Sequence, residues 1–324
     1  MTVESVMGNA RGSGVEATER DPAADALMAR VRGVLLLSGQ VGSTPLLEAL
    51  TRSVVDLPVS ADRRVIDIWQ QEVTAVAEQH DLAHLPLRVL VNHRAANPAP
   101  PVPSQRVLTQ VEQDAGEFRG TAGAIRDAAA DYGDDDWLLV ASGGQLLVRS
   151  LAPIVDALCQ QPGDVRLLVH SDGTPTTLML VRCGVLNEVP RVGFVDFKEQ
   201  ALPRIAESHR VQVLEQREPV GMPVRTRDDY LQALYRYHGP ARDGAQFNPF
   251  METWQRTFSV IEPGAVVSDS ARIHDAVILD GAHVEAGAVV SRSVVCDRAR
   301  VTRNRRVVER VVPGPRRAGS DADG

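Results

Sequence analysis

The sequence predicts an α/β domain followed by a short all-β domain. Three observations support this fold class: apolar runs alternate with helical patterns, a glycine-rich turn follows the first run, and a 17-residue repeat lies near the C-terminal end. Apolar runs separated by amphipathic helices are typical of a parallel sheet that is covered on both faces. A repeat of fixed period is typical of stacked coils. We therefore expect a mixed or parallel sheet domain and then a β-helix.

The predicted sheet begins at the apolar run Val31–Leu37, which is followed by SGQVGSTPLLEAL. A buried run, a glycine loop and a helix start are typical of the opening of a Rossmann-like domain. Residues Pro98–Pro103 (PAPPVP) lack the N–H groups that a sheet needs, so we expect a loop there, near the sheet edge or over the site. Further strands are expected at 87–91, 137–141, 165–169 and 177–181, and helices at 66–78 and 122–132.

The repeat has a period of 17 residues. Ile261, Val267 and Ile273 recur 17 positions later, and the third set follows after another 17 (Ile278, Val284, Val290; Val295, Val301, Val307). A coil of three faces, each of about six residues, would place these branched side chains inside a triangular prism. The pattern resembles the hexapeptide-repeat left-handed β-helix, one residue short per turn, and an ordinary β-meander is the alternative.

Composition is consistent with two globular parts. The chain has 324 residues, of which 44% are apolar and 24% charged. Residues 1–27 and 313–324 are polar and lack periodicity, so we expect a disordered arm and a disordered tail. We place the α/β domain at 28–238, a linker rich in turn formers at 239–258, and the β-helix at 259–312.

Charge and composition argue against several classes of partner. A net charge of −7 is unlike a nucleic-acid-binding surface. The chain has neither an apolar run of membrane-spanning length nor a signal-peptide pattern, so we expect no membrane partner and a cytoplasmic location. Three isolated cysteines predict neither a disulfide framework nor a zinc site. The histidines show no metal-binding spacing, and no metal site is predicted from them (His93, His170, His274, His283).

Two glycine segments are the candidate nucleotide-binding elements. In the first, Gly39, Gly42 and Ser43 follow the first strand, where backbone N–H groups and a helix N-terminus favour phosphate. The same loop fits an ordinary strand-to-helix turn equally well. The second segment is GTAGA at 120–124, whose small residues would let a base or ribose approach the backbone. Its candidate residues are Gly120, Thr121, Ala122 and Gly123, with Thr121 either capping the helix or donating to a ligand.

Together with VVDLPV at 54–59 and RTRDDYLQAL at 225–234, the GTAGA segment resembles the sugar-1-phosphate nucleotidyltransferases, or nucleotide-sugar pyrophosphorylases. Mannose-1-phosphate guanylyltransferase and glucose-1-phosphate adenylyltransferase are examples of this family. The resemblance spans about 31–312. It implies that GTAGA contacts the base, that the chain ends in a left-handed β-helix, and that Mg²⁺ is the cofactor if the protein is active; otherwise we expect none.

The departures from the family pattern fall on its catalytic residues. Thr44 stands where the family has a pyrophosphate-binding arginine, and Arg52 or Ser53 stands where it has an activating lysine. Gly144 stands at the position of the first metal-binding aspartate. The second aspartate falls near Met222 or Pro223. Displaced acids are available, although acidic residues at such places usually form turns or helix caps (Asp134, Asp135, Asp136, Asp196, Asp228, Asp229).

Three functional hypotheses follow. The first is a catalytically degenerate relative that binds a nucleotide or sugar nucleotide in a regulatory or assembly role. The second is an active sugar-1-phosphate nucleotidyltransferase that releases pyrophosphate. The third is a β-helix acyltransferase with His274 or His283 as base. Arg52 and Lys198, the only lysine, are candidate phosphate-binding residues, although a surface role also suits Lys198. We expect assembly into a homo-oligomer or with a related subunit through the β-helix.

Overall fold

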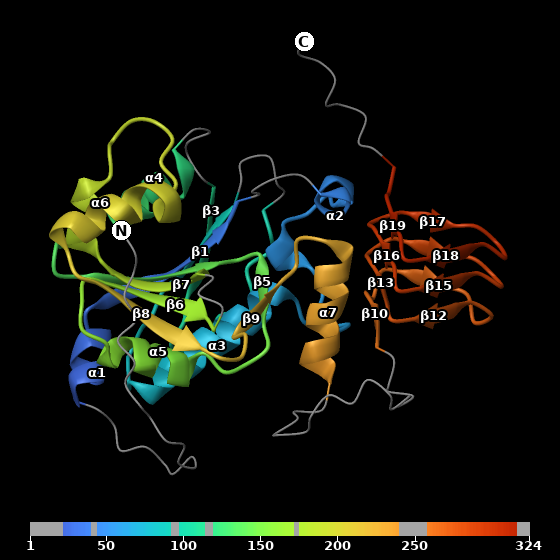
Figure 1. Cartoon of the computed structure of the whole chain (residues 1–324). Helices are drawn as coiled ribbons and strands as arrows, with labels where there is room; N and C mark the ends of the chain where they lie inside the picture. Colours follow the sequence, from blue (N-terminus) through green and yellow to red (C-terminus); the bar gives the residue numbers. More distant parts are fainter. Residues whose placement is uncertain are drawn as a thin grey trace.

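The computed structural model describes residues 22–39, 44–91, 97–113, 119–171, 175–239 and 258–315. An α/β domain is followed by a β-helix that packs beside it (Figure 1). The predicted α/β fold class is therefore confirmed. Most of the predicted 239–258 linker lies outside the described residues. Among the helices that the structure describes, none is long and apolar enough to cross a membrane.

Seven strands form the main sheet in the order β3-β2-β1-β4-β7-β6-β8. All neighbouring pairs are parallel except those of β7, which runs antiparallel to β4 and β6. The five predicted strands are present, and the sheet is mixed, as the prediction of a mixed or parallel sheet allowed. Only four residues separate β6 from β7, too few for the crossover that a parallel pair needs. The strands are β1 (Val31–Ser38), β2 (Leu87–Val91), β3 (Thr109–Gln113), β4 (Trp137–Ser142), β6 (Val165–His170), β7 (Pro175–Arg182) and β8 (Val211–Gln216).

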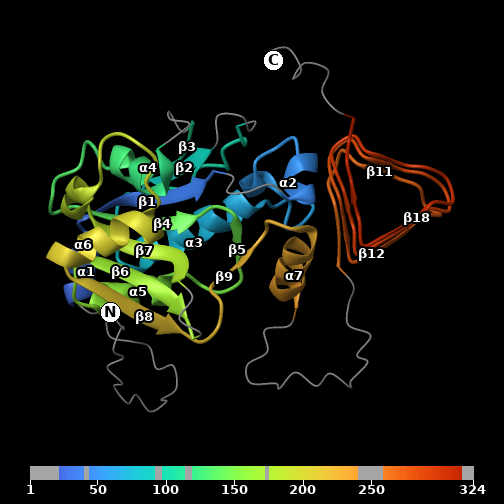
Figure 2. The same cartoon turned by 45° about the horizontal axis from the view of Figure 1, so that its top comes forward.

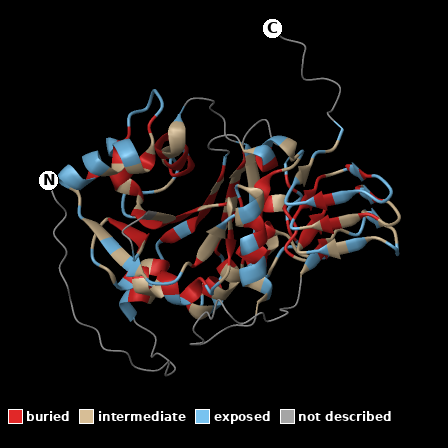
Figure 3. Cartoon of the chain, turned by 45° about the vertical axis from the view of Figure 1, so that its right-hand side comes forward, coloured by how far each residue is buried: buried red, intermediate tan, exposed pale blue. Residues whose placement is uncertain are grey.

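Helices cover both faces of this sheet, and two apolar clusters form the core. One cluster lies under α1, α3, α5 and α7, and the other under α4 and α6. Buried residues accordingly follow the sheet and the inward sides of the helices (Figure 3). The helices are α1 (Pro22–Met28), α2 (Pro45–Ala49), α3 (Val65–Gln79), α4 (Gly120–Ala128), α5 (Ala152–Gln160), α6 (Leu202–Ser208) and α7 (Arg227–His238). The short segments are η1 (Val54–Asp56), η2 (Cys183–Glu188) and η3 (Phe197–Ala201).

The N-terminal arm is shorter than expected. We expected residues 1–27 to lack structure, whereas α1 begins at Pro22 and buries Ala24 and Met28 against the core. Its Asp25 carboxylate lies 2.7 Å from Nδ1 of His80, whose side chain is only 2% exposed. These two buried apolar residues and the contact with His80 hold the helix against the domain. The polar composition of the segment does not predict this packing.

Residues 259–312 form three parallel sheets that enclose a triangular prism (Figure 2). The register pairs Ser259 with Ala276, Val266 with His283 and Arg272 with Val289, each 17 positions apart. The predicted period is confirmed; the predicted left-handedness remains a prediction. The strands are β10 (Ser259–Ile261), β11 (Val266–Val267), β12 (Arg272–His274), β13 (Ala276–Ile278), β14 (His283–Val284), β15 (Val289–Ser291), β16 (Val294–Val295), β17 (Arg300–Val301), β18 (Arg306–Val308) and β19 (Val311–Val312).

The β-helix shares a core with the α/β domain. Val277, Val294 and Cys296 belong to the same buried cluster as Leu46 and Leu47 of α2. The contact also contains charge, because the Arg52 guanidinium lies 2.8 Å from Oε1 of Glu262 and also pairs with Asp297. One face of the prism is therefore an interdomain surface and not a free one.

Candidate functional site

The order of the sheet places its switch point between β1 and β4. The chain passes from β1 to β2 on one side and later returns to place β4 on the other. In open α/β sheets, ligands bind outside the carboxyl ends of the strands at such a point. β1 ends at Ser38, β4 ends at Ser142, and Leu37 pairs with Ser142 in the register. Gly39 follows β1 and is exposed, whereas Gly42 and Ser43 lie outside the described residues.

The segment 223–225 brings three distant positions together at this edge. The N–H of Val224 donates to the carbonyl of Gly144 at 3.0 Å. The short strands β5 (Gln145–Leu147) and β9 (Gly221–Pro223) also pair antiparallel, with Gln145 opposite Pro223. On the other side, the Thr44 hydroxyl donates to the carbonyl of Arg225 at 2.6 Å. Thr44, Gly144 and Pro223, the positions where this chain departs from the nucleotidyltransferase pattern, are thus neighbours.

These three residues offer little to a metal ion. Oγ1 of Thr44 accepts from Leu47 N–H at 3.2 Å and caps α2, while Gly144 and Pro223 have no side-chain oxygen. Mg²⁺ requires near-octahedral oxygen ligands, usually with one or two carboxylates. Among the described residues, no group of three His, Cys, Asp or Glu side chains lies in a metal-binding arrangement. The residues present at the expected position therefore do not fit Mg²⁺.

The backbone around Gly144 nevertheless leaves room for a side chain. A Cβ added at Gly144 would meet nothing closer than the Ser142 hydroxyl, at 3.5 Å. The neighbouring Gly143 is different, since its Cβ would lie 2.9 Å from Val55 and 3.0 Å from Ser38. Close packing accounts for the glycine at 143 but not for the glycine at 144.

The displaced acidic residues serve local structure, as expected. Asp134, Asp135 and Asp136 form the turn before β4, at the amino end of that strand. Asp196 caps η3, accepting from the backbone N–H groups of Lys198 and Glu199. Asp229 forms a capping box with Thr226 at the start of α7, and Asp228 pairs with Arg227.

The GTAGA segment opens α4 and is packed against residues 195–197. Gly120 has a φ of +68°, and a Cβ there would lie 2.4 Å from the carbonyl oxygen of Val195. The Thr121 hydroxyl donates to Asp196 at 3.1 Å and accepts from Phe197 N–H at 2.8 Å. Ala122 and Gly123 are buried. These contacts explain the small residues structurally, and base binding by the segment stays a prediction.

The two candidate phosphate-binding residues are Arg52, which follows α2, and Lys198 in η3, while Ser53, the alternative to Arg52, is buried with its hydroxyl 3.1 Å from that of Ser38 at the end of β1. Burial lowers the pKa of Arg52, but its hydrogen bonds to Asp297 and Glu262 outweigh burial and raise it. A phosphate would have to displace both carboxylates. Lys198 begins η3 and is half-buried; burial lowers its pKa, and Asp196 partly offsets this. The structure thus gives Arg52 an interdomain role that sequence reasoning missed.

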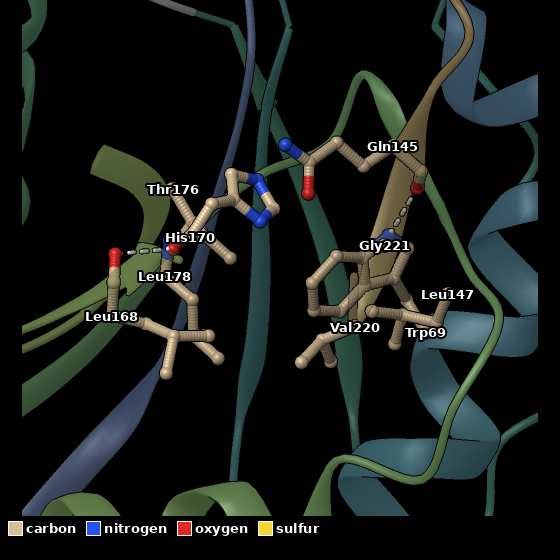
Figure 4. Close-up of a pocket in the computed structure, with 10 residues that line it drawn as sticks. Trp69, Gln145, Leu147, Leu168, His170, Thr176, Leu178, Val220 and Gly221 are labelled. Atoms are coloured by element: carbon tan, nitrogen blue, oxygen red, sulfur yellow. Dashed lines mark hydrogen bonds between the residues drawn. The ribbon is translucent and has the colours of Figure 1, made fainter. Parts of the chain in front are cut away.

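A small pocket lies beside Gly144, at the carboxyl ends of β4 and β6 (Figure 4). The His170 ring and the Gln145 amide point toward each other across it, above the Trp69 ring. Trp69 Nε1 donates to the carbonyl of Gln145 at 3.0 Å, and the Thr176 hydroxyl donates to the carbonyl of Leu168 at 2.8 Å. Its volume of about 10 Å³ is close to the minimum for one water molecule. A nucleotide or sugar would therefore have to lie outside it.

Sequence reasoning did not select Trp69, Gln145 or Thr176. Trp69 lies on the buried face of a predicted helix and reads as core, which it is. The position of Gln145 directly after a strand and a glycine pair was the only available signal. His170 was considered only as a metal ligand, although it directly follows the predicted strand 165–169 and ends β6 at the carboxyl edge.

Comparison with known proteins gave weak similarities. No protein-family model matches the chain, and no curated protein matches it by sequence. A Bacillus anthracis structure named as a glucose-1-phosphate thymidylyltransferase is 12% identical, with a TM-score of 0.47, and covers 67% of this chain and 97% of its own. A homologue of Mycobacterium tuberculosis rv0371c, from Mycobacterium sp. strain JC1, is 16% identical, with a TM-score of 0.43, and covers 64% and 97%. Neither likeness is strong enough to assign a family or an activity.

Proposed function

We propose that this chain is a nucleotidyltransferase-like protein of nucleotide-sugar metabolism that binds a nucleotide or sugar nucleotide but does not transfer the nucleotidyl group. One observation carries the proposal. Thr44, Gly144 and Pro223 gather at the switch point of the sheet through the hydrogen bonds of segment 223–225. The family resemblance places the pyrophosphate-binding arginine and the two metal-binding aspartates at these positions. The architecture of the site is retained while its charged groups are replaced.

An arginine and a bound Mg²⁺ at these positions would lower the barrier to phosphoryl transfer, and this chain lacks the side chains for both. Positioned positive charge and Mg²⁺ stabilise the charge that develops on the transferring phosphate. Loss of a single such donor commonly costs about 10²- to 10³-fold in rate, and loss of a catalytic arginine about 10³- to 10⁵-fold. Binding needs less, because backbone N–H groups at a strand-to-helix loop hold phosphate without a metal. Binding without turnover is the expected combination.

Calorimetry and a pyrophosphate-release assay test the two parts separately. The full chain would be titrated with GTP, ATP, UTP and dTTP, with and without Mg²⁺, and each binder would then be assayed with sugar-1-phosphates. We expect binding that does not require Mg²⁺ and no release of pyrophosphate. Mg²⁺-dependent turnover would support the alternative, an active sugar-1-phosphate nucleotidyltransferase. No binding by any of these nucleotides, nor by their sugar nucleotides in the same titration, would refute the proposal.

Restoring the carboxylates is a sharper test of the site itself. The open space at Gly144 and the exposure of Pro223 allow Gly144→Asp together with Pro223→Asp without a clash at the first position. We expect this double variant to bind Mn²⁺ or Mg²⁺, detected by calorimetry, whereas the uncharged pair Gly144→Asn and Pro223→Asn should not. Equal metal binding by both pairs, or by neither, would contradict the assignment of these positions.

We also propose a cytoplasmic location and assembly through the β-helix. The strands of the first coil, β10, β11 and β12, have a neighbour on one side only, and such edges favour association with another chain. Light scattering after size-exclusion chromatography measures the assembly, and a monomer at all concentrations would refute it.

A further inference from the structure

The last coil of the β-helix differs from the others in charge. The first coil, 259–275, carries three acidic residues and one arginine. The third coil, 293–309, carries five arginines against two acidic residues, and Arg310 follows directly. This concentration of positive charge occurs in a chain with a net charge of −7. The end of the prism is therefore cationic on an otherwise acidic protein.

Three of these arginines line a single depression. Arg305, Arg306 and Arg310 are exposed and surround a hollow of about 490 Å³. The remaining wall is apolar and consists of the valines of β18 and β19 and the proline that follows (Val307, Val311, Val312, Pro313). The strands β18 and β19 end their sheets, so no further coil covers them within the described residues (Figure 2).

Nearby acidic groups do not neutralise this cluster. Glu309 pairs with Arg292 at 2.6 Å, and Glu285 pairs with Arg300. No carboxylate in the described part of the chain forms an ion pair with Arg305, Arg306 or Arg310. Among the described residues, these three guanidinium groups therefore have no carboxylate partner that an anion would have to displace.

We propose that this depression binds a phosphorylated small molecule, with its phosphoryl oxygens on Arg305, Arg306 and Arg310. The planar guanidinium group matches the oxygens of a phosphate through paired hydrogen bonds. The hollow falls within the usual size range of small-molecule sites, and the valine and proline wall gives a ring or carbon chain an apolar surface. None of the residues that line this depression belongs to the candidate site at Gly144, so the proposal does not depend on the function proposed there.

Another explanation predicts a different behaviour. Charged residues on an exposed strand edge also prevent edge-to-edge association. If that were their only role, replacing the arginines would promote aggregation but would not change affinity for phosphates. Phosphate binding and the prevention of association can be told apart, because only phosphate binding requires the three side chains to contact one ligand.

The test is calorimetry of the full chain against inorganic pyrophosphate and ADP in buffer with EDTA and without added metal. Arg305→Ala, Arg306→Ala and Arg310→Ala should each weaken binding by about tenfold or more, since each removes a charge-assisted contact. Arg272→Ala is the matched control: Arg272 is exposed on the same face as Arg306, two coils away, and should leave affinity unchanged.

The outcomes decide the proposal. Weakening by the three substitutions but not by Arg272→Ala, with unchanged melting temperatures, supports it. Absence of pyrophosphate and ADP binding to the unaltered chain overturns it, as does equal affinity of the unaltered chain and the triple variant. Much tighter binding of a single-stranded DNA oligonucleotide through the same arginines would overturn the assignment to a small molecule.

Discussion

Replacement of Arg52 by methionine should destabilise the contact between the α/β domain and the β-helix. In the folded protein the guanidinium group lies between Glu262 and Asp297. The side chains are 15%, 12% and 12% exposed, respectively. Arg52→Met keeps the apolar stem but leaves two carboxylates facing each other in a poorly solvated contact. Breaking a buried ion pair in this way typically costs about 3–5 kcal/mol.

Other contacts of the carboxylates place the expected loss near the lower end of that range. Glu262 accepts from Asp280 N–H at 2.7 Å, and Asp297 accepts from the Thr51 hydroxyl at 3.2 Å. We therefore expect the free energy of unfolding to fall by about 3 kcal/mol. The assay is urea unfolding followed by circular dichroism at pH 7, with midpoints and slopes compared between the two proteins.

The pH dependence gives this prediction a second readout. Burial raises the pKa of Glu262 even with Arg52 present, although the Arg52 hydrogen bond opposes the shift. A carboxyl with a raised folded pKa favours the folded state at low pH and loses that contribution as the pH rises through its folded value. Removal of Arg52 should raise this pKa further, so the deficit of Arg52→Met should be smaller at pH 5 than at pH 7.

The matched control is Arg292→Met. Arg292 pairs with Glu309 at 2.6 Å on the same β-helix, but the two side chains are 60% and 51% exposed. Exposed pairs contribute about 0–1 kcal/mol. If Arg52→Met and Arg292→Met lowered stability equally, or if the deficit of Arg52→Met did not change with pH, the reasoning about the interdomain pair would be refuted.

Three further predictions concern stability. Gly120→Ala should cost more than about 2 kcal/mol, because it combines a positive φ with a Cβ 2.4 Å from the Val195 carbonyl, whereas Gly39→Ala, in open space, should change stability by less than about 0.5 kcal/mol in urea unfolding. Arg298→Gly should raise the melting temperature, with a gain of about 0.5–1 kcal/mol, because Arg298 is exposed and has a φ of +57°; a lower melting temperature would contradict this. Burial raises the pKa of Cys296 to about 12. The folded thiol therefore keeps its proton above about pH 8.5, where an unfolded thiol ionises, and this residue should lower the free energy of unfolding by about 1.4 kcal/mol per pH unit from there upward; Cys183, whose pKa burial raises to about 11, should add a similar fall. Cys296→Ala should flatten that fall by the same amount, measured in urea at pH 8 and pH 10 with a reducing agent.

The sequence was informative where a local pattern determines the structure. The 17-residue recurrence of branched residues fixed the coil length, because each inward side chain must stack on its equivalent in the next coil. Val31–Leu37 was recognisable as a buried strand for a similar reason. The direction of β7 could not be read from its own residues, since direction depends on the connection that precedes it.

The site could be predicted only in part, because its geometry comes from contacts between distant segments. Gly144 and Pro223 are brought together by the pairing of β5 with β9. No pattern in the sequence of either short strand predicts this pairing. Arg52 could be seen as a charge, but its partners lie 210 and 245 positions away. The packing of Gly120 against Val195 was also invisible, so small residues that suggested a ligand turned out to have a structural reason.

The position of α2 suggests how the two parts of the molecule could influence each other. Thr44 caps its first turn and hydrogen-bonds to Arg225 at the candidate site, while Arg52, just beyond its end, pairs with the β-helix. Coupling between sites requires an element whose arrangement both sites bias, and α2 contacts both. If ligand binding at the edge shifts α2, Arg52→Met should change nucleotide affinity although the Arg52 guanidinium group pairs with carboxylates of the β-helix. If a folded Arg52→Met protein bound nucleotide with unchanged affinity, the pairing of Arg52 with the β-helix would have no influence on the candidate site.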